Sequence, residues 1–144
     1  MKIKTFRGLL ADGGQDTIRL STRNGLTGYK INRFEAMGKT PGASNQESVI
    51  KIFKVKQDSV DGVIDFNDSR LMAAAITTTS VDQEDFPLSN AVIFDNEIIN
   101  QDIFITHFDV KTGESANYYL ELEQVKLDIN EAAVATLKDM RGRE

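Results

Sequence analysis

The sequence predicts an all-β protein, a two-sheet antiparallel β-sandwich of jelly-roll type with about eight strands. Turn signals recur about every 8–12 residues along the chain. Between them lie short runs rich in β-branched and aromatic residues, which fit the half-buried surface of a sheet. An open barrel is the alternative architecture. The length of 144 residues favours a single domain that spans residues 1–144.

The first third of the chain predicts a meander of three strands. Residues 2–10 form the first strand, and an Asp-Gly turn, a strong hairpin signal, joins it to residues 16–22. An Asn-Gly turn then leads to the third strand, residues 29–37. The apolar pattern of this strand changes phase between Ile31 and Phe34. We therefore expect consecutive strands to pair with one another.

The middle of the chain alternates between loops and strands. Glycine, proline and serine cluster in residues 38–46, which predicts a loop. Residues 48–56 are rich in β-branched side chains and predict a strand. Residues 70–76 fit a short helix by their alanine content, but we favour a strand. A polar, acidic loop is expected at residues 80–90.

The stretch from residue 90 to residue 127 holds the densest apolar run and organises the predicted fold. We expect strands at residues 92–94, 98–99, 103–110 and 118–127, with a glycine-containing turn at residues 111–115. The last two strands are predicted to pair as a hairpin. After Gln124 the apolar phase shifts, which indicates either a β-bulge or the end of the strand.

Both faces of the predicted hairpin carry apolar side chains, so both need cover. One cover is the second sheet, and the other is a loop, the terminal segment or a neighbouring subunit. The candidate interface residues on this hairpin are Phe104, Phe108, Tyr118 and Tyr119. The sequence thus predicts a homo-oligomer, or a chain that stays soluble alone but docks on a particle.

A short C-terminal helix is expected at residues 131–141. Asn130 is the predicted N-cap. Val134, Leu137 and either Met140 or Arg141 are predicted to form the buried stripe of this helix.

The composition of the chain argues against nucleic acid and membranes as partners. The net charge of −5 and the pI near 4.9 argue against direct binding of nucleic acid, which needs clustered Lys and Arg. Zero cysteines exclude disulfides and thiolate metal sites. The apolar runs are shorter than the ~20 residues of a membrane helix, so no membrane is expected as a partner.

Two loop motifs lack the residues that ligand binding needs. Gly38-Lys39-Thr40 matches the end of a P-loop, but Arg33 stands where the motif requires its first glycine. Residues 61–68 resemble the second half of a calcium loop that would begin at residue 57, but Gln57 and Ser59 occupy its first and third ligand positions. We expect an acidic turn there, no metal site, and no cofactor site.

Catalytic groups are equally sparse. His107 and Asp109 share one face of a strand, as a base and its orienting carboxylate or two ligands of a metal site would. A hydrolase also needs a nucleophile and an oxyanion hole, and a zinc site needs a third ligand. Glu121 and Glu123 share a face, yet alternation on a solvated sheet gives the same pattern. We therefore expect no catalytic residues and no enzyme activity.

Three segments, FRGLLADGGQDTIRLSTRNGLTGYKI at residues 6–31, FDNEIINQDIFITH at residues 94–107 and NYYLELEQVKL at residues 117–127, resemble small virion-associated proteins of bacteriophages, marine ones especially. The resemblance implies a non-enzymatic virion structural or assembly protein, made in the host cytoplasm. Its partners would be copies of itself and other virion proteins.

The alternative function is a β-sandwich binding module for carbohydrate or another surface ligand, and an enzyme ranks third. A cluster of exposed aromatics on a concave face would favour the binding module, whereas broad apolar patches would favour assembly.

Overall fold

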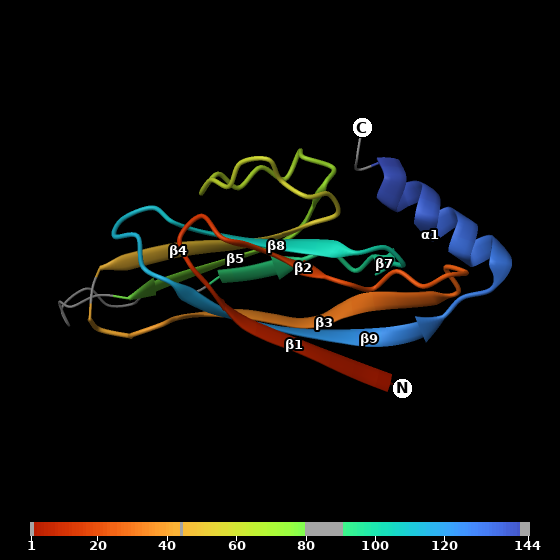
Figure 1. The fold of residues 1–144 in the computed structure, drawn as a ribbon, viewed down its shortest axis with the longest axis horizontal. Coiled ribbons are helices and arrows are strands. Elements are labelled where there is room, and N and C mark those ends of the chain that lie inside the picture. Colours follow the sequence, from red (N-terminus) through yellow and green to blue (C-terminus); the bar gives the residue numbers. More distant parts are fainter. Residues whose placement is uncertain (1, 44, 80–90, 142–144) are drawn as a thin grey trace.

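The computed structural model describes residues 2–43, 45–79 and 91–141. Within these ranges the chain forms nine strands and one helix, arranged as two stacked antiparallel sheets with the helix at one end (Figure 1). The elements are β1 (Lys2–Leu10), β2 (Gln15–Ile18), β3 (Thr27–Gly38), β4 (Gln46–Phe53), β5 (Leu71–Thr79), β6 (Ala91–Phe94), β7 (Ile98–Ile99), β8 (Ile103–Asp109), β9 (Ala116–Lys126) and α1 (Ile129–Arg141). The predicted β-sandwich is confirmed.

The strand pairs are nested along the chain. One sheet has the order β1-β9-β3-β7, and the other has the order β2-β8-β4-β5-β6. Thus β1 pairs with β9, β2 with β8, β3 with β7, and β4 with β5, always antiparallel. Successive strands from β1 to β4 lie alternately in the two sheets, and so do successive strands from β6 to β9.

This nesting overturns two predicted pairings. The predicted hairpin of residues 103–127 is wrong, because β8 and β9 lie in different sheets. The predicted N-terminal meander is also wrong, because β2 lies in the opposite sheet and β9 separates β1 from β3. Both errors have the same physical cause: a tight turn can cross from sheet to sheet as well as join neighbouring strands.

The hydrophobic core fills the space between the sheets. Alternate residues of β9 point inward, so Tyr118, Leu120 and Leu122 are buried together. On β8 the inward set includes Ile103 and Ile105. The other sheet elements add Leu10, Ile18, Tyr29, Ile31, Phe34, Ile50, Ile52, Met72, Ala73, Ala75 and Ile99 to the same cluster.

A β-bulge accounts for the phase change of β3. The register between β3 and β9 shifts between Ile31 and Arg33, so Asn32 is the extra residue. The bulge places Ile31 and Phe34 on the same buried face, as the apolar pattern predicted. The pattern change after Gln124, by contrast, marks the end of β9 at Lys126 and not a bulge.

The C-terminal helix begins two residues earlier than expected. Its N-terminus is closed by a capping box in which Asp128 Oδ1 accepts a hydrogen bond from the Glu131 backbone N–H at 2.7 Å, and Glu131 Oε1 accepts one from the Asp128 N–H at 3.3 Å. The predicted cap, Asn130, therefore lies inside the first turn. The predicted inner stripe is also wrong: Ala132 and Ala135 are buried, while Val134 and Leu137 face solvent.

Residues 71–79 form a strand and not a helix, as favoured. The predicted loop at residues 80–90 lies outside the described residues. The segment between β4 and β5 folds back over the outer face of the five-stranded sheet (Figure 1). Within the described ranges, α1 is too short and too polar to cross a membrane.

Candidate functional site

The four predicted interface residues do not form one surface. Phe104 and Phe108 lie on the outer face of β8, in the five-stranded sheet, where both are half-buried. Tyr119 lies on the outer face of β9, in the other sheet, and Tyr118 points into the core. A Cβ on Gly62 would stand 3.3 Å from the Phe108 ring, so the β4–β5 segment covers this aromatic. The cover predicted for β8 is thus a loop of the same chain.

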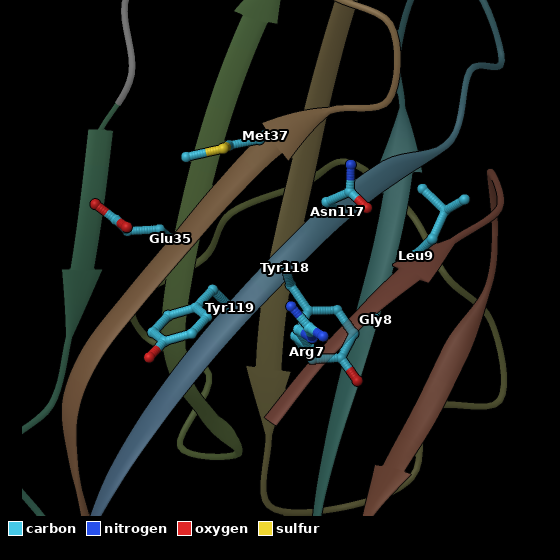
Figure 2. Close-up of a pocket in the computed structure, with 8 residues that line it drawn as sticks. All are labelled: Arg7, Gly8, Leu9, Glu35, Met37, Asn117, Tyr118 and Tyr119. Atoms are coloured by element: carbon cyan, nitrogen blue, oxygen red, sulfur yellow. The ribbon is translucent and has the colours of Figure 1, made fainter. Parts of the chain in front are cut away.

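A shallow pocket of about 480 Å³ lies on the outer face of the four-stranded sheet. Figure 2 shows its lining from three adjacent strands, β1, β9 and β3. The register aligns the side chains in two rows across these strands, with Arg7, Tyr119 and Glu35 in one and Leu9, Asn117 and Met37 in the other. Tyr119 is the outward-facing aromatic of this lining.

Charged partners surround Tyr119. The Arg33 guanidinium lies 5.5 Å from the centre of the Tyr119 ring, which is a cation–π distance. Arg33 Nη2 also donates to Glu35 Oε2 at 2.8 Å, so the same arginine is oriented by both neighbours. The surface therefore combines one aromatic face with cationic, anionic and amide groups, a composition that suits a polar ligand or a protein partner.

Glu121 and Glu123 lie on this outer face but act separately. Glu121 Oε2 accepts a hydrogen bond from Asn32, the bulge residue, at 3.0 Å. Glu123 Oε2 lies 3.6 Å from Lys30 Nζ. Each carboxylate has its own polar partner across the strand, which is the arrangement of a solvated sheet face.

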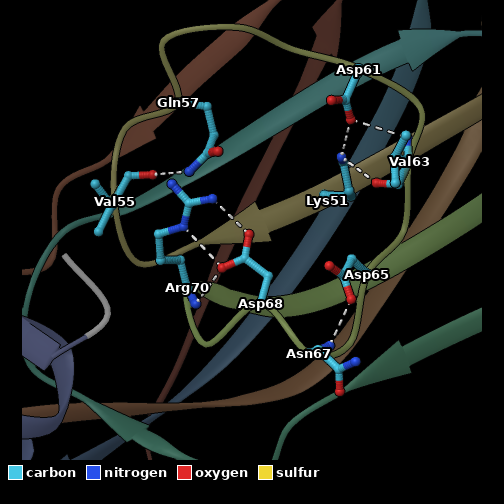
Figure 3. A network of polar contacts seen from close by, with 9 residues as sticks. All are labelled: Lys51, Val55, Gln57, Asp61, Val63, Asp65, Asn67, Asp68 and Arg70. Carbon is cyan, nitrogen blue, oxygen red and sulfur yellow. Dashed lines mark hydrogen bonds and ion pairs between the residues drawn. The ribbon is translucent and has the colours of Figure 1, made fainter. Parts of the chain in front are cut away.

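A polar network fixes the β4–β5 segment on the other sheet (Figure 3). Lys51, on the outer face of β4, is buried, and its Nζ donates to Asp61 Oδ1 at 3.0 Å and to the Val63 carbonyl at 2.6 Å. The hydrogen bond from Lys51 is the main reason that the pKa of Asp61 lies below its usual range. A buried ammonium thus finds both charge and hydrogen-bond partners in the loop above it.

Asp65 and Asp68 of this predicted acidic turn also form hydrogen bonds. Asp68 receives two hydrogen bonds from the Arg70 side chain, at 2.9 and 2.8 Å, which lower the pKa of Asp68. Asp65 Oδ1 accepts from the Asn67 backbone N–H at 2.9 Å. Within the described ranges, no three His, Cys, Asp or Glu side chains come together as metal ligands would. Asp61, Asp65 and Asp68 form hydrogen bonds that organise the loop instead.

His107 and Asp109 do not form a base–orienter pair. His107 is fully buried, and its Nδ1 donates to the Ala11 carbonyl, which can only accept, across 3.1 Å. Its Nε2 lies 2.8 Å from Ser48 Oγ, and Gln46 Nε2 donates to the same oxygen at 2.6 Å. This chain of donors is satisfied internally and buried, which fits a structural role at one end of the core.

Asp109 holds the connection between β8 and β9. Its carboxylate accepts hydrogen bonds from the backbone N–H groups of Glu47, Lys111, Thr112 and Glu114, and from the Thr112 hydroxyl. Burial raises the pKa of Asp109, but these donors outweigh it and the pKa lies below its usual range. The residue fixes the turn that crosses between the sheets.

Two apolar surfaces were missed by sequence reasoning. The edge strand β6 has all four of its residues exposed. The outer face of α1 exposes Ile129, Val134 and Leu137. Ala132 and Ala135 are the sequence feature that could have identified the buried face of the helix. Small residues allow the helix to pack closely on the sandwich, so its bulkier side chains point outward.

The chain matches no known family model. No curated protein sequence is significantly similar to it.

Proposed function

We propose that this protein is a non-enzymatic structural or assembly subunit of a bacteriophage virion. The observation that carries the assembly role is the apolar edge strand β6. Its sequence is Ala-Val-Ile-Phe, and all four residues are exposed. Among the strands of the described ranges, only β5 pairs with it. An exposed apolar edge strand is a template for another chain, and a protein that works alone usually blunts such an edge with charge.

The virion setting is supported by topology and resemblance. We infer that the sandwich is a jelly roll, because four nested antiparallel pairs alternate between two sheets. Jelly rolls are common in viral capsid domains, although the fold alone assigns no function. The resemblance of three segments to phage virion proteins points the same way.

Ile93 is the position at which to test the edge. It pairs with Ala74 and lies on the outer side of the sheet with 56% of its surface exposed, so a lysine there leaves the core intact. The control is Phe66→Lys, which adds the same charge at a loop residue that is 65% exposed. We expect Ile93→Lys to abolish incorporation into particles while its thermal unfolding stays unchanged, and Phe66→Lys to incorporate normally.

The direct measurement is quantitative mass spectrometry of purified phage particles, combined with sedimentation of the pure protein. A fixed copy number per particle, retained through a high-salt wash, is the expected result. A strictly monomeric protein that is absent from particles would refute the proposal.

The pocket on the four-stranded sheet favours the second candidate, a binding module for carbohydrate or another surface ligand. Tyr119 offers one ring face, and Arg7, Glu35 and Asn117 offer hydrogen bonds around it. One outward aromatic is fewer than the cluster expected of such a module, so this function ranks second. Glycan-array binding that is lost in Tyr119→Ala and kept in Phe66→Lys would reverse the ranking.

A further inference from the structure

The helix α1 turns its bulky apolar side chains away from the molecule. Ile129 has 78% of its surface exposed, Leu137 57% and Val134 53%, while Ala132 and Ala135 pack inward beside Leu127. Figure 1 shows α1 at one end of the sandwich, with its outer side clear of both sheets. An exposed apolar face on a helix of 13 residues indicates that another element packs on it.

Grooves flank the helix on both sides. One, of about 600 Å³, is lined mainly by apolar groups, including Leu26, Ile129, Ala133 and Leu137. The other, of about 490 Å³, includes Ile98, Leu127 and Val134, with Glu131 and Lys138 on the helix itself. The helix is therefore a ridge between two grooves, which is the shape that accepts another helix lying alongside it.

The charged residues on α1 favour a second copy of α1, in an antiparallel orientation, as the helix that packs beside it. Glu131 and Lys138 are seven residues apart, or about two turns, and so lie on the same flank of the helix. If a second copy of α1 lies antiparallel, with a two-fold axis close to residues 134–135, Glu131 of each copy faces Lys138 of the other. A parallel arrangement places these flanks on opposite sides and brings no such pairs together. Antiparallel packing also sets opposite ends of the helix dipoles side by side.

We propose that α1 is a homodimerisation helix, which packs antiparallel against α1 of a second copy of this chain across a two-fold axis. Ala133, Val134 and Leu137 form the centre of the contact, and the Glu131–Lys138 pairs flank it. The interface is isologous, so one helix supplies both halves of it. The inference rests on the proposed assembly role and names one of its contacts.

Sedimentation velocity over a range of concentrations tests the contact. Leu137→Glu buries a charge in the apolar centre, and we expect it to raise the dimer dissociation constant by at least about tenfold. Phe66→Glu is the control, because it adds the same charge at an exposed loop position, and its dimerisation should match the unaltered protein. An unaltered protein that is monomeric at every concentration, or a dimer that Leu137→Glu leaves unchanged, overturns the proposal.

Charge exchange tests the orientation. Glu131→Lys and Lys138→Glu should each weaken self-association, because each places like charges opposite one another. A mixture of the two variants should form heterodimers preferentially. Glu131→Lys also removes one arm of the capping box, but loss of helix would not be repaired by mixing. Failure of the mixture to associate better than either variant alone contradicts the antiparallel arrangement.

Disulfide trapping gives an independent readout, because the chain contains no cysteine. Val134→Cys lies beside the proposed two-fold axis and should form a cross-linked dimer under mild oxidation. Ile129→Cys should not, because the axis leaves its two copies roughly 16 Å apart along the helices, beyond disulfide reach. Cross-linking of Ile129→Cys at the same rate would refute the antiparallel packing.

Comparison with particles separates the two proposals. A protein that is incorporated into virions but never dimerises through α1 would overturn this inference and leave the proposed function standing. A protein that dimerises through α1 but is absent from virions would overturn the proposed function alone.

Discussion

Removing one hydroxyl group, in Tyr118→Phe, isolates a contact between the two sheets. Tyr118 lies on β9, and its Oη donates a hydrogen bond to Asp16 Oδ2 of β2 at 3.1 Å. The ring fits because Gly8, its partner on β1, has no side chain: a Cβ there would stand 2.9 Å from the ring. A hydrogen bond to a charged group contributes roughly 1.5–3 kcal/mol, and the half-buried Asp16 can rehydrate, so we expect a loss of about 1.5 kcal/mol at pH 7.

The pH dependence of this loss provides the sharper test. Burial, and then the nearby Asp16 carboxylate, raise the pKa of Tyr118 well above its usual value of 10.0. The unfolded chain therefore releases the Tyr118 proton before the folded protein does. Stability from the neutral phenol is complete below pH 10 and falls as pH rises beyond it, by up to about 1.4 kcal/mol per pH unit. Phe has no proton to lose, so the stability gap should narrow by about half at pH 10.5 and close near pH 11.

Urea unfolding of both proteins at pH 7, 9, 10 and 10.5 measures the gap at each pH. Tyr119→Phe is the matched control, because its hydroxyl has no hydrogen bond among the described residues, and we expect it to change stability little at any of these pH values. A gap between Tyr118→Phe and the unaltered protein that is absent at pH 7, or that stays constant up to pH 10.5, would refute the reasoning.

Three further predictions follow from particular contacts. Gly28→Ala should destabilise the protein by about 1–3 kcal/mol in urea unfolding, because the added Cβ would lie 3.0 Å from Leu127 and 2.7 Å from a methyl group of Ile98; unchanged stability would show that these side chains move freely. Asp128→Ala should lower the stability of the protein and reduce the helical signal in circular dichroism, whereas Asp128→Asn, which keeps a capping oxygen, should have a smaller effect. Calorimetric titration with calcium should show no micromolar binding to residues 57–68, and micromolar binding abolished by Asp65→Ala would contradict this.

The sequence located the strands well because each strand leaves a local signal. Residues 2–10 match β1, and the predicted strand at residues 103–110 differs from β8 by one residue. The apolar side chains of β9 also alternate in step with its buried positions. These properties depend on neighbours in sequence, so pattern and propensity are enough to find them.

Strand pairing leaves no such signal. Gly113 has a φ of 76°, as its turn requires, but the same glycine serves a hairpin and a crossing between sheets equally well. The candidate interface residues are divided between the two sheets for this reason, since Phe104 lies on β8, Tyr119 lies on β9, and these strands do not pair. The buried face of α1 was predicted wrongly because the spacing of apolar residues points to the bulky ones, Val134 and Leu137. Close packing against Leu127 instead buries Ala132 and Ala135.

The nested topology also governs how the chain reaches its native state. In one sheet the interior strand β9 follows β1, β3 and β7 in the chain, and in the other sheet β8 lies between β2 and β4. Lys2 pairs with Gln124, and Leu10 with Ala116, so β1 meets its partner across more than a hundred residues. Such long-range pairing carries a large loop-closure cost and makes folding slow. Neither sheet can be completed on the ribosome until β8 and β9 have emerged, and until then the inner edges of β1, β3, β2 and β4 stay open to chaperones and to other nascent copies.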